Sequence, residues 1–153
     1  MNIFTEEELQ ELTQEIERQL QELEVAGTVS IRVPAFARAD EENPEVLQRD
    51  SQLPRKQVEV IAQVIGRSFS TFFKDFLDAA LDSICEKTGK LNQLWQKLGD
   101  WNNPASINII ASVLAGMGIA EKNLRLICAP LVAILIDLGI EALCRGYKRC
   151  RQS

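Results

Sequence analysis

Apolar residues recur at helical spacing near the start of the chain. The predicted helix begins after Thr5, which forms a capping-box pattern with Glu8. Its remaining positions are mostly Glu and Gln, so one narrow apolar seam runs along an otherwise polar helix. This apolar seam consists of Leu9, Leu12, Ile16, Leu20 and Leu23. Because such a helix is not stable alone, we expect the seam to pack against either the rest of this chain or another protein.

The pattern changes after this helix. Val29, Ile31 and Val33 alternate with polar residues, which is the spacing of a strand. A single short strand has no predicted partner in this chain, so it is interpreted as a linker, with pairing between subunits as the alternative. Residues 36–54 are polar and contain two prolines. Residues 26–54 are therefore predicted to be an extended or flexible connector.

The longest helical pattern runs from Arg55 to about Lys87 and has a wide apolar stripe with several phenylalanines. Gly66 predicts a bend or break near its middle. Gly89 is expected to end the pattern as a left-handed cap. A shorter amphipathic helix follows, and Gly99 is expected to close it.

The most apolar segments, residues 109–120 and 126–136, carry no charge. Each is shorter than the roughly 20 residues that span a bilayer, which favours core helices of a soluble domain. Pro130 predicts a kink or a helix start within the second segment. The predicted fold is therefore all-α, with a bundle of about four helices over residues 55–150 and a separate acidic helix over residues 1–25.

The same segments allow a second interpretation, in which residues 105–144 form a membrane-active hairpin. Two apolar helices joined by a short charged turn and sheltered by amphipathic helices resemble, in arrangement alone, the hydrophobic hairpin of colicin-type pore-forming domains. No motif is shared, and no family is assigned. Asp137 and Glu141 interrupt the continuation of the second apolar segment toward Cys144, and a carboxylate at the bilayer centre costs about 2.5–3.5 kcal/mol. This favours a conditional or interfacial association over a permanent span.

Charge is distributed unevenly along the 153 residues. Residues 1–50 contain 13 acidic and 4 basic side chains, whereas residues 51–153 contain 9 and 13. The net charge of −5 gives no bulk basic surface, so we expect no nucleic-acid partner. The basic residues near the C-terminus either cap the last helix or contact anionic lipid or the acidic N-terminal segment. They are Arg145, Lys148, Arg149 and Arg151.

The composition contains no histidine, which removes histidine-based triads, histidine-containing zinc sites and imidazole pH sensors. No glycine-rich phosphate loop or nucleophile elbow is present. Asp137 and Glu141 are interpreted as a solvent-facing pair rather than as an acid and a base. The stripe Asp75, Asp78, Asp82 and Glu86 is likewise interpreted as a solvated helix face rather than a cation site. We expect no catalytic residue, cofactor or metal.

The four cysteines, Cys85, Cys128, Cys144 and Cys150, form no C-x-x-C pair. The acidic N-terminus lacks the features of a signal peptide, so we expect a cytoplasmic protein with reduced cysteines. The alternatives are peripheral association with a membrane and an intermolecular bridge through Cys150.

These observations predict a non-catalytic helical module for protein interaction or self-assembly. The N-terminal helix is expected to bind a protein partner or a second copy through its apolar seam. The alternative function is a small membrane-active protein that inserts the hairpin of residues 105–144.

Overall fold

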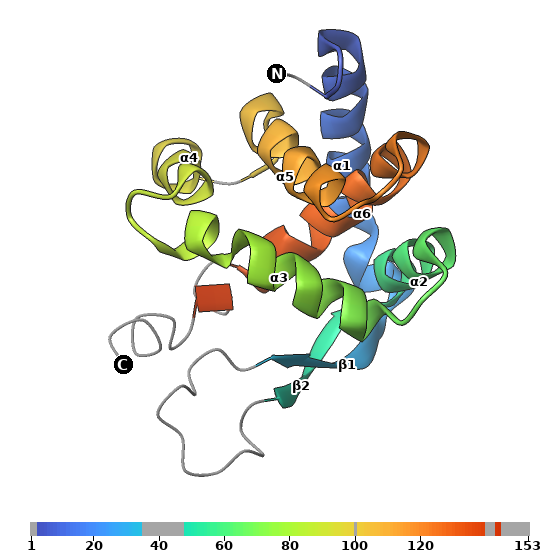
Figure 1. The fold of residues 1–153 in the computed structure, drawn as a ribbon. Helices are drawn as coiled ribbons and strands as arrows, with labels where there is room; N and C mark the ends of the chain where they lie inside the picture. Colours follow the sequence, from blue (N-terminus) through green and yellow to red (C-terminus); the bar gives the residue numbers. More distant parts are fainter. Residues whose placement is uncertain (1–2, 35–47, 100, 140–142, 145–153) are drawn as a thin grey trace.

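The computed structural model describes residues 3–34, 48–99, 101–139 and 143–144. Within these ranges the chain forms six helices and one two-stranded sheet (Figure 1). Their order is α1 (Glu6–Ala26), β1 (Thr28–Pro34), β2 (Gln48–Pro54), α2 (Arg55–Ile65), α3 (Phe69–Cys85), α4 (Lys90–Leu98), α5 (Pro104–Gly116) and α6 (Glu121–Leu138). The predominance of helix confirms the all-α fold class. Five helices, rather than about four, follow the sheet in the described part of the chain.

Helix α1 begins where the capping box predicted. The Thr5 hydroxyl accepts a hydrogen bond from the Glu8 backbone N–H at 3.1 Å, and the Thr5 N–H donates to the Glu8 carboxylate at 2.9 Å. The helix ends at Gly27, whose φ of 80° is readily adopted by glycine. Along its length α1 packs against α6 and α5, near the other end of the described chain.

The connector prediction is wrong at its two ends, because they pair with each other. β1 and β2 form an antiparallel sheet in which Thr28 faces Pro54 and Pro34 faces Gln48. The predicted strand therefore has a partner within the chain. The sequence of the partner strand, QRDSQLP, has no alternation of apolar and polar residues. Its pairing is stabilised by backbone hydrogen bonds and by the fully buried Leu53. Residues 35–47 lie outside the described residues.

The long helical pattern from Arg55 divides into α2 and α3, as Gly66 predicted. Gly66 adopts a left-handed φ of 76°, and its N–H closes the last turn on the Ala62 carbonyl. Ser68 then caps α3 by accepting a hydrogen bond from the Thr71 N–H at 3.2 Å.

The role predicted for Gly89 is wrong. Helix α3 ends at Cys85, and Gly89 has a φ of −67° as the residue before α4. A Cβ at this position would lie 2.3 Å from the Ser83 carbonyl oxygen, so glycine is required by a close backbone approach rather than by a left-handed turn. Gly99, in contrast, ends α4 at a φ of 86°, as expected.

Helix α6 lies inside the fold and contacts α1, α2, α5 and β2. Residues 127–135 are all buried, so this helix is apolar around its whole circumference. Helix α5 precedes it and buries one side, and its N-terminus is capped by the Asn103 side chain, which accepts from the Ser106 N–H at 2.8 Å. Both apolar segments thus contribute to the core.

A tryptophan pair fixes α4 to the start of α5. Trp101 is fully buried, and its indole N–H donates to the Leu91 carbonyl at 2.9 Å. Its ring packs against Trp95 with centroids 4.8 Å apart.

The expectation of reduced cysteines is wrong for two of the four. Cys85, the last residue of α3, forms a disulfide with Cys144 beyond the end of α6, with the Cα atoms 5.5 Å apart. Nothing local in the sequence indicates this pairing, because 59 positions separate the two residues. Cys128 is a free thiol in the core, where burial raises its pKa to about 12. Cys150 lies outside the described residues.

Candidate functional site

The apolar seam predicted to bind a partner is largely buried within the chain itself. Leu9 and Leu12 are each 4% exposed and Ile16 is fully buried in the main core cluster, while Leu20 and Leu23 are half-buried. The pattern left two options open, packing against the same chain or against another protein. In the structure the seam packs against the same chain. Leu9, Leu12 and Ile16 therefore hold α1 in place within the chain.

The four basic residues of the predicted C-terminal contact, residues 145–151, lie outside the described residues. Asp137, one of the pair considered for acid–base chemistry, is an exposed residue of α6, but partial desolvation of its carboxyl raises its pKa. Glu141, the other, lies outside the described residues.

The acidic stripe on α3 is a solvated face with its own counter-ions. Asp75 lies 3.6 Å from the Arg67 guanidinium, and Asp78 lies 3.0 Å from the Lys74 ammonium. Among the described residues no group of three or more His, Cys, Asp or Glu side chains is arranged to hold a metal ion.

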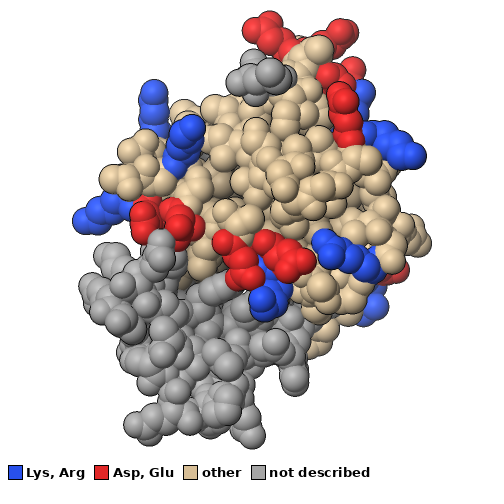
Figure 2. Space-filling model, viewed as in Figure 1, with Lys and Arg blue, Asp and Glu red and all other residues tan. Residues whose placement is uncertain are grey.

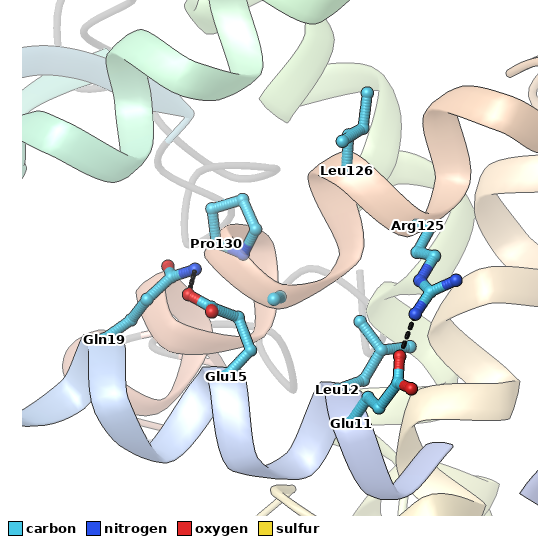
Figure 3. Close-up of a pocket in the computed structure, with 8 residues that line it drawn as sticks. Glu11, Leu12, Glu15, Gln19, Arg125, Leu126 and Pro130 are labelled. Carbon is cyan, nitrogen blue, oxygen red and sulfur yellow. Dashed lines mark hydrogen bonds and ion pairs between the residues drawn. The ribbon is translucent and has the colours of Figure 1, made fainter. Parts of the chain in front are cut away.

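A groove between α1 and α6 is the candidate site (Figure 3). It encloses about 380 Å³ and presents carboxylates on one wall and apolar groups with one guanidinium on the other. Its lining residues are Glu11, Leu12, Glu15 and Gln19 from α1, and Arg125, Leu126, Ala129 and Pro130 from α6. The buried seam positions the groove, since Leu12 forms part of its floor while the next positions around the helix point outward.

An ion pair closes one end of the groove. The Arg125 guanidinium contacts the Glu11 carboxylate directly, as Figure 3 shows, and lies 3.5 Å from Glu8 one turn earlier. Both Arg125 and Glu11 are about half exposed, so the pair is screened by solvent and contributes little to folding. The Glu11 carboxylate stays accessible to solvent despite this ion pair.

A chain of hydrogen bonds organises the other end. The Gln19 amide donates to Glu15 at 2.8 Å and accepts from the amide of the buried Gln57 at 3.2 Å. Burial raises the pKa of Glu15, but hydrogen bonds from Gln19 and Arg18 outweigh it, and the pKa lies below its ordinary value. Glu15 is therefore held as a carboxylate at neutral pH. The Gln57 side-chain oxygen is buried without a hydrogen-bond partner.

The α6 wall combines an exposed apolar side chain with a proline inside the helix. Leu126 is 56% exposed, the largest exposed fraction among the described large apolar side chains. Pro130 lies inside the helix and has no N–H, so the Leu126 carbonyl cannot receive the usual bond from residue 130. Leu126 and Pro130 are one turn apart on the same face, and both line the groove.

The surface charge around this site is acidic on the α1 side. Asp and Glu side chains gather over the N-terminal end of α1 at the top of the molecule, with Lys and Arg side chains next to them at the upper right and others near α4 at the left (Figure 2). A second hollow, of about 500 Å³, lies between α1 and α5 on the other side of α1. Glu6 is the acidic residue in its lining.

The residues that matter in the groove were not identified from the sequence as a site. For Pro130 the sequence predicted a kink or a helix start, and Leu126 was the first residue of the apolar segment 126–136. Glu11 and Arg125 are 114 positions apart, so no local pattern could have joined them.

Comparison of the chain with protein-family models, with curated proteins and with solved structures finds no match. Among the described residues, no helix combines the length and the apolar character that crossing a membrane requires.

Proposed function

We propose that this protein is a non-catalytic helical module that binds a protein segment in the groove between α1 and α6. The observation that carries the proposal is a groove whose lining includes both the carboxylate residues Glu11 and Glu15 and the exposed Leu126. An apolar anchor surrounded by polar and charged groups is the usual anatomy of a protein-binding surface. The N-terminal helix remains the binding element, but through its acidic side instead of its apolar seam.

The groove selects for a basic partner with at least one apolar side chain. Its acceptors are the carboxylates of Glu11 and Glu15, which pair with ammonium or guanidinium donors. A phosphate backbone would be repelled by the same carboxylates, which argues against a nucleic-acid ligand. The buried amide chain behind Glu15 supports the proposal because it holds that carboxylate in one orientation before any partner arrives.

The proposal is tested with a short labelled peptide that alternates Leu and Arg, compared with a peptide in which Glu replaces Arg. Fluorescence anisotropy at low salt measures binding to the wild-type protein and to the double variant Glu11→Gln, Glu15→Gln. The matched control, Glu17→Gln with Glu59→Gln, removes the same charge from exposed positions outside the groove. We expect the groove variant to weaken binding of the basic peptide about tenfold, the equivalent of two charge-assisted contacts of about 0.7 kcal/mol each.

Equal weakening in the control variant would show that only overall charge matters and would refute the groove. Failure of the basic peptide to bind at all would refute the proposed function.

A second candidate function is interfacial membrane association of residues 105–144, favoured by the uninterrupted burial of residues 127–135 in α6. In this proposal the surrounding helices shield the apolar helix, and the basic residues after it contact anionic lipid. Vesicles with anionic lipid, loaded with dye and tested between about pH 5 and pH 8, distinguish this function, since carboxylate protonation favours entry into lipid. Absence of both flotation and dye release over that range would rule it out.

A further inference from the structure

Helix α4 presents a second uncovered surface. Lys90 and Lys97 are seven positions apart and therefore lie on the same side of the helix. Leu94 and Leu98 follow Lys90 at steps of four positions and lie beside the lysines. Both lysines are exposed, Leu94 is half-buried and Leu98 is 50% exposed. These four residues are named the α4 face. Among the described residues neither lysine forms an ion pair.

The chemistry of the α4 face matches that of the groove between α1 and α6. The groove is lined by the carboxylates of Glu11 and Glu15, and its apolar lining includes Leu126, which is 56% exposed. Leu98 and Leu126 are the two most exposed large apolar side chains among the described residues, one beside Lys97 and the other in an acidic groove. We propose that the α4 face of one copy of this chain docks in the groove of a second copy. This inference rests on the proposed function of the groove and names its partner.

Charge complementarity carries the inference. Helix α1 contains eight glutamates and one arginine, whereas α4 contains two lysines and no acidic residue. Among the described residues only Arg125 and Lys56 from other elements form ion pairs with α1, so most of its negative charge is not neutralised. The potential along α1 is therefore negative, and it attracts the α4 face before any contact forms. Each carboxylate oxygen can accept more than one hydrogen bond, so Glu11 can bind an ammonium group while it contacts Arg125.

The α4 helix of the same chain cannot fill the groove, because the fold holds it elsewhere. Leu91 of α4 is fully buried, and its carbonyl accepts a hydrogen bond from the Trp101 indole at 2.9 Å. The Asn92 amide donates to the Ile84 carbonyl of α3, also at 2.9 Å. Helix α5 lies between α4 and α1 in Figure 1 and packs against both. Moving α4 into its own groove would break these contacts, so the groove receives an α4 face only from another molecule.

A protein surface fits the α4 face better than a lipid surface does. Two lysines provide little attraction to an anionic membrane, because stable attachment needs a larger basic cluster or a deeper apolar anchor. In the groove the same two ammonium groups meet two carboxylates, and Leu98 meets apolar groups in a hollow of about 380 Å³. Every copy carries both surfaces, so the partner is present whenever the protein is.

The contact joins two different surfaces and is therefore heterologous. A pair of copies keeps one free groove and one free α4 face, so further copies add unless the arrangement closes. The two surfaces are small, and small interfaces give weak complexes whose formation depends on concentration. We therefore expect reversible association that salt weakens, since exposed ion pairs are screened.

Sedimentation velocity of the full chain, over a range of concentrations at low salt, tests the inference. Every sample carries Cys150→Ser, so an intermolecular disulfide cannot imitate the assembly. The α4 variant is Lys97→Gln with Leu98→Ala. Its control, Lys122→Gln with Val60→Ala, changes an exposed lysine and an exposed apolar side chain on other helices.

The groove variant is Glu11→Gln with Glu15→Gln, and its control is Glu17→Gln with Glu59→Gln. We expect the wild type and both controls to associate, and the α4 and groove variants each to associate at least tenfold more weakly. Mixing the two variants restores one contact, between the intact α4 face of the groove variant and the intact groove of the α4 variant. The mixture should therefore form pairs of copies and no larger assembly.

Three results of this experiment overturn the inference. They are a wild type that stays monomeric throughout, association that survives in either variant, and a mixture of the two variants that forms no pairs.

The labelled basic peptide separates this inference from the proposed function. If the peptide binds the wild type but not the groove variant while the wild type stays monomeric, the groove works as proposed and α4 is not its occupant. If neither the peptide nor a second copy binds, both proposals fail. If a monomeric wild type floats with anionic vesicles and the α4 variant does not, the α4 face contacts lipid, which also overturns the inference.

Discussion

Removal of the Cys85–Cys144 bond is expected to cost this fold a large part of its stability. The bond closes a loop of 59 residues that contains α4, α5 and α6. In the unfolded chain the same bond restricts the distance between its ends, so breaking it increases the entropy of the unfolded state. The perturbation is the double variant Cys85→Ser, Cys144→Ser, with the reduced wild type as an independent second form.

The magnitude follows from the size of the loop. Loop-closure entropy for about 60 residues corresponds to about 4 kcal/mol at room temperature. Domains of this size unfold with a total of about 5–15 kcal/mol, so the loss is a substantial fraction. With a urea dependence of about 2 kcal/mol per molar, the unfolding midpoint should fall by about 2 M.

Urea unfolding is followed by tryptophan fluorescence. Both tryptophans of the chain lie within the closed loop, and the fully buried Trp101 gives a large change in emission when it meets water. Cys150→Ser is the control, because it removes a thiol without touching the bond, and its midpoint should equal that of the wild type.

Coincident midpoints for the oxidised, reduced and double-variant proteins would refute the reasoning. Peptide mapping under non-reducing conditions gives the direct check, since a linked peptide containing Cys85 and Cys144 must be recovered from the oxidised protein.

Three further outcomes are expected from single substitutions. Ile16→Ala removes a fully buried side chain of α1 and should lower the free energy of unfolding by about 3 kcal/mol, and an unchanged urea midpoint would show that α1 is not docked. Gly89→Ala places a Cβ against the Ser83 carbonyl and should lower the free energy of unfolding by about 1–3 kcal/mol. Gly116→Ala, with open space around the new Cβ, should raise the free energy of unfolding by about 0.5–1 kcal/mol. Burial raises the pKa of Asp137, so its ionised form disfavours the folded state at neutral pH. Asp137→Asn should therefore raise the midpoint near pH 7 and have no advantage at about pH 3, where the carboxyl is protonated in both states, and equal gains at both pH values would contradict this.

Features that depend on neighbouring residues could be predicted from the sequence. The Thr5 and Glu8 cap, the break at Gly66 and the end of the short helix at Gly99 each involve residues within a few positions, and all three are present. Helical periodicity identified the fold class for the same reason, because the hydrogen bonds of a helix are local.

Features that depend on long-range pairing could not be predicted. Pairing of β1 with β2 uses backbone groups that every residue carries, so Gln48–Pro54 gave no sign of being a strand. Gly89 shows a related limit. A glycine in a sequence fits either a left-handed turn or a close approach of another backbone segment, and only the tertiary packing shows which one applies. The groove joins Glu11 to Arg125 for reasons of tertiary packing, so its existence followed from no motif.

The docking of α1 on α6 has a consequence for the order of events during synthesis. The ion pair of Glu8 with Arg125 spans 117 positions, and the apolar side of α1 faces the same late-made helix. A ribosome therefore releases the first helix well before its binding surface exists, and at about 5–20 residues per second this interval lasts several seconds or more. During that time the leucine-rich side of α1 is open to chaperones and to other nascent chains. Helix α1 is thus made well before α6 and is buried only after α6 has emerged.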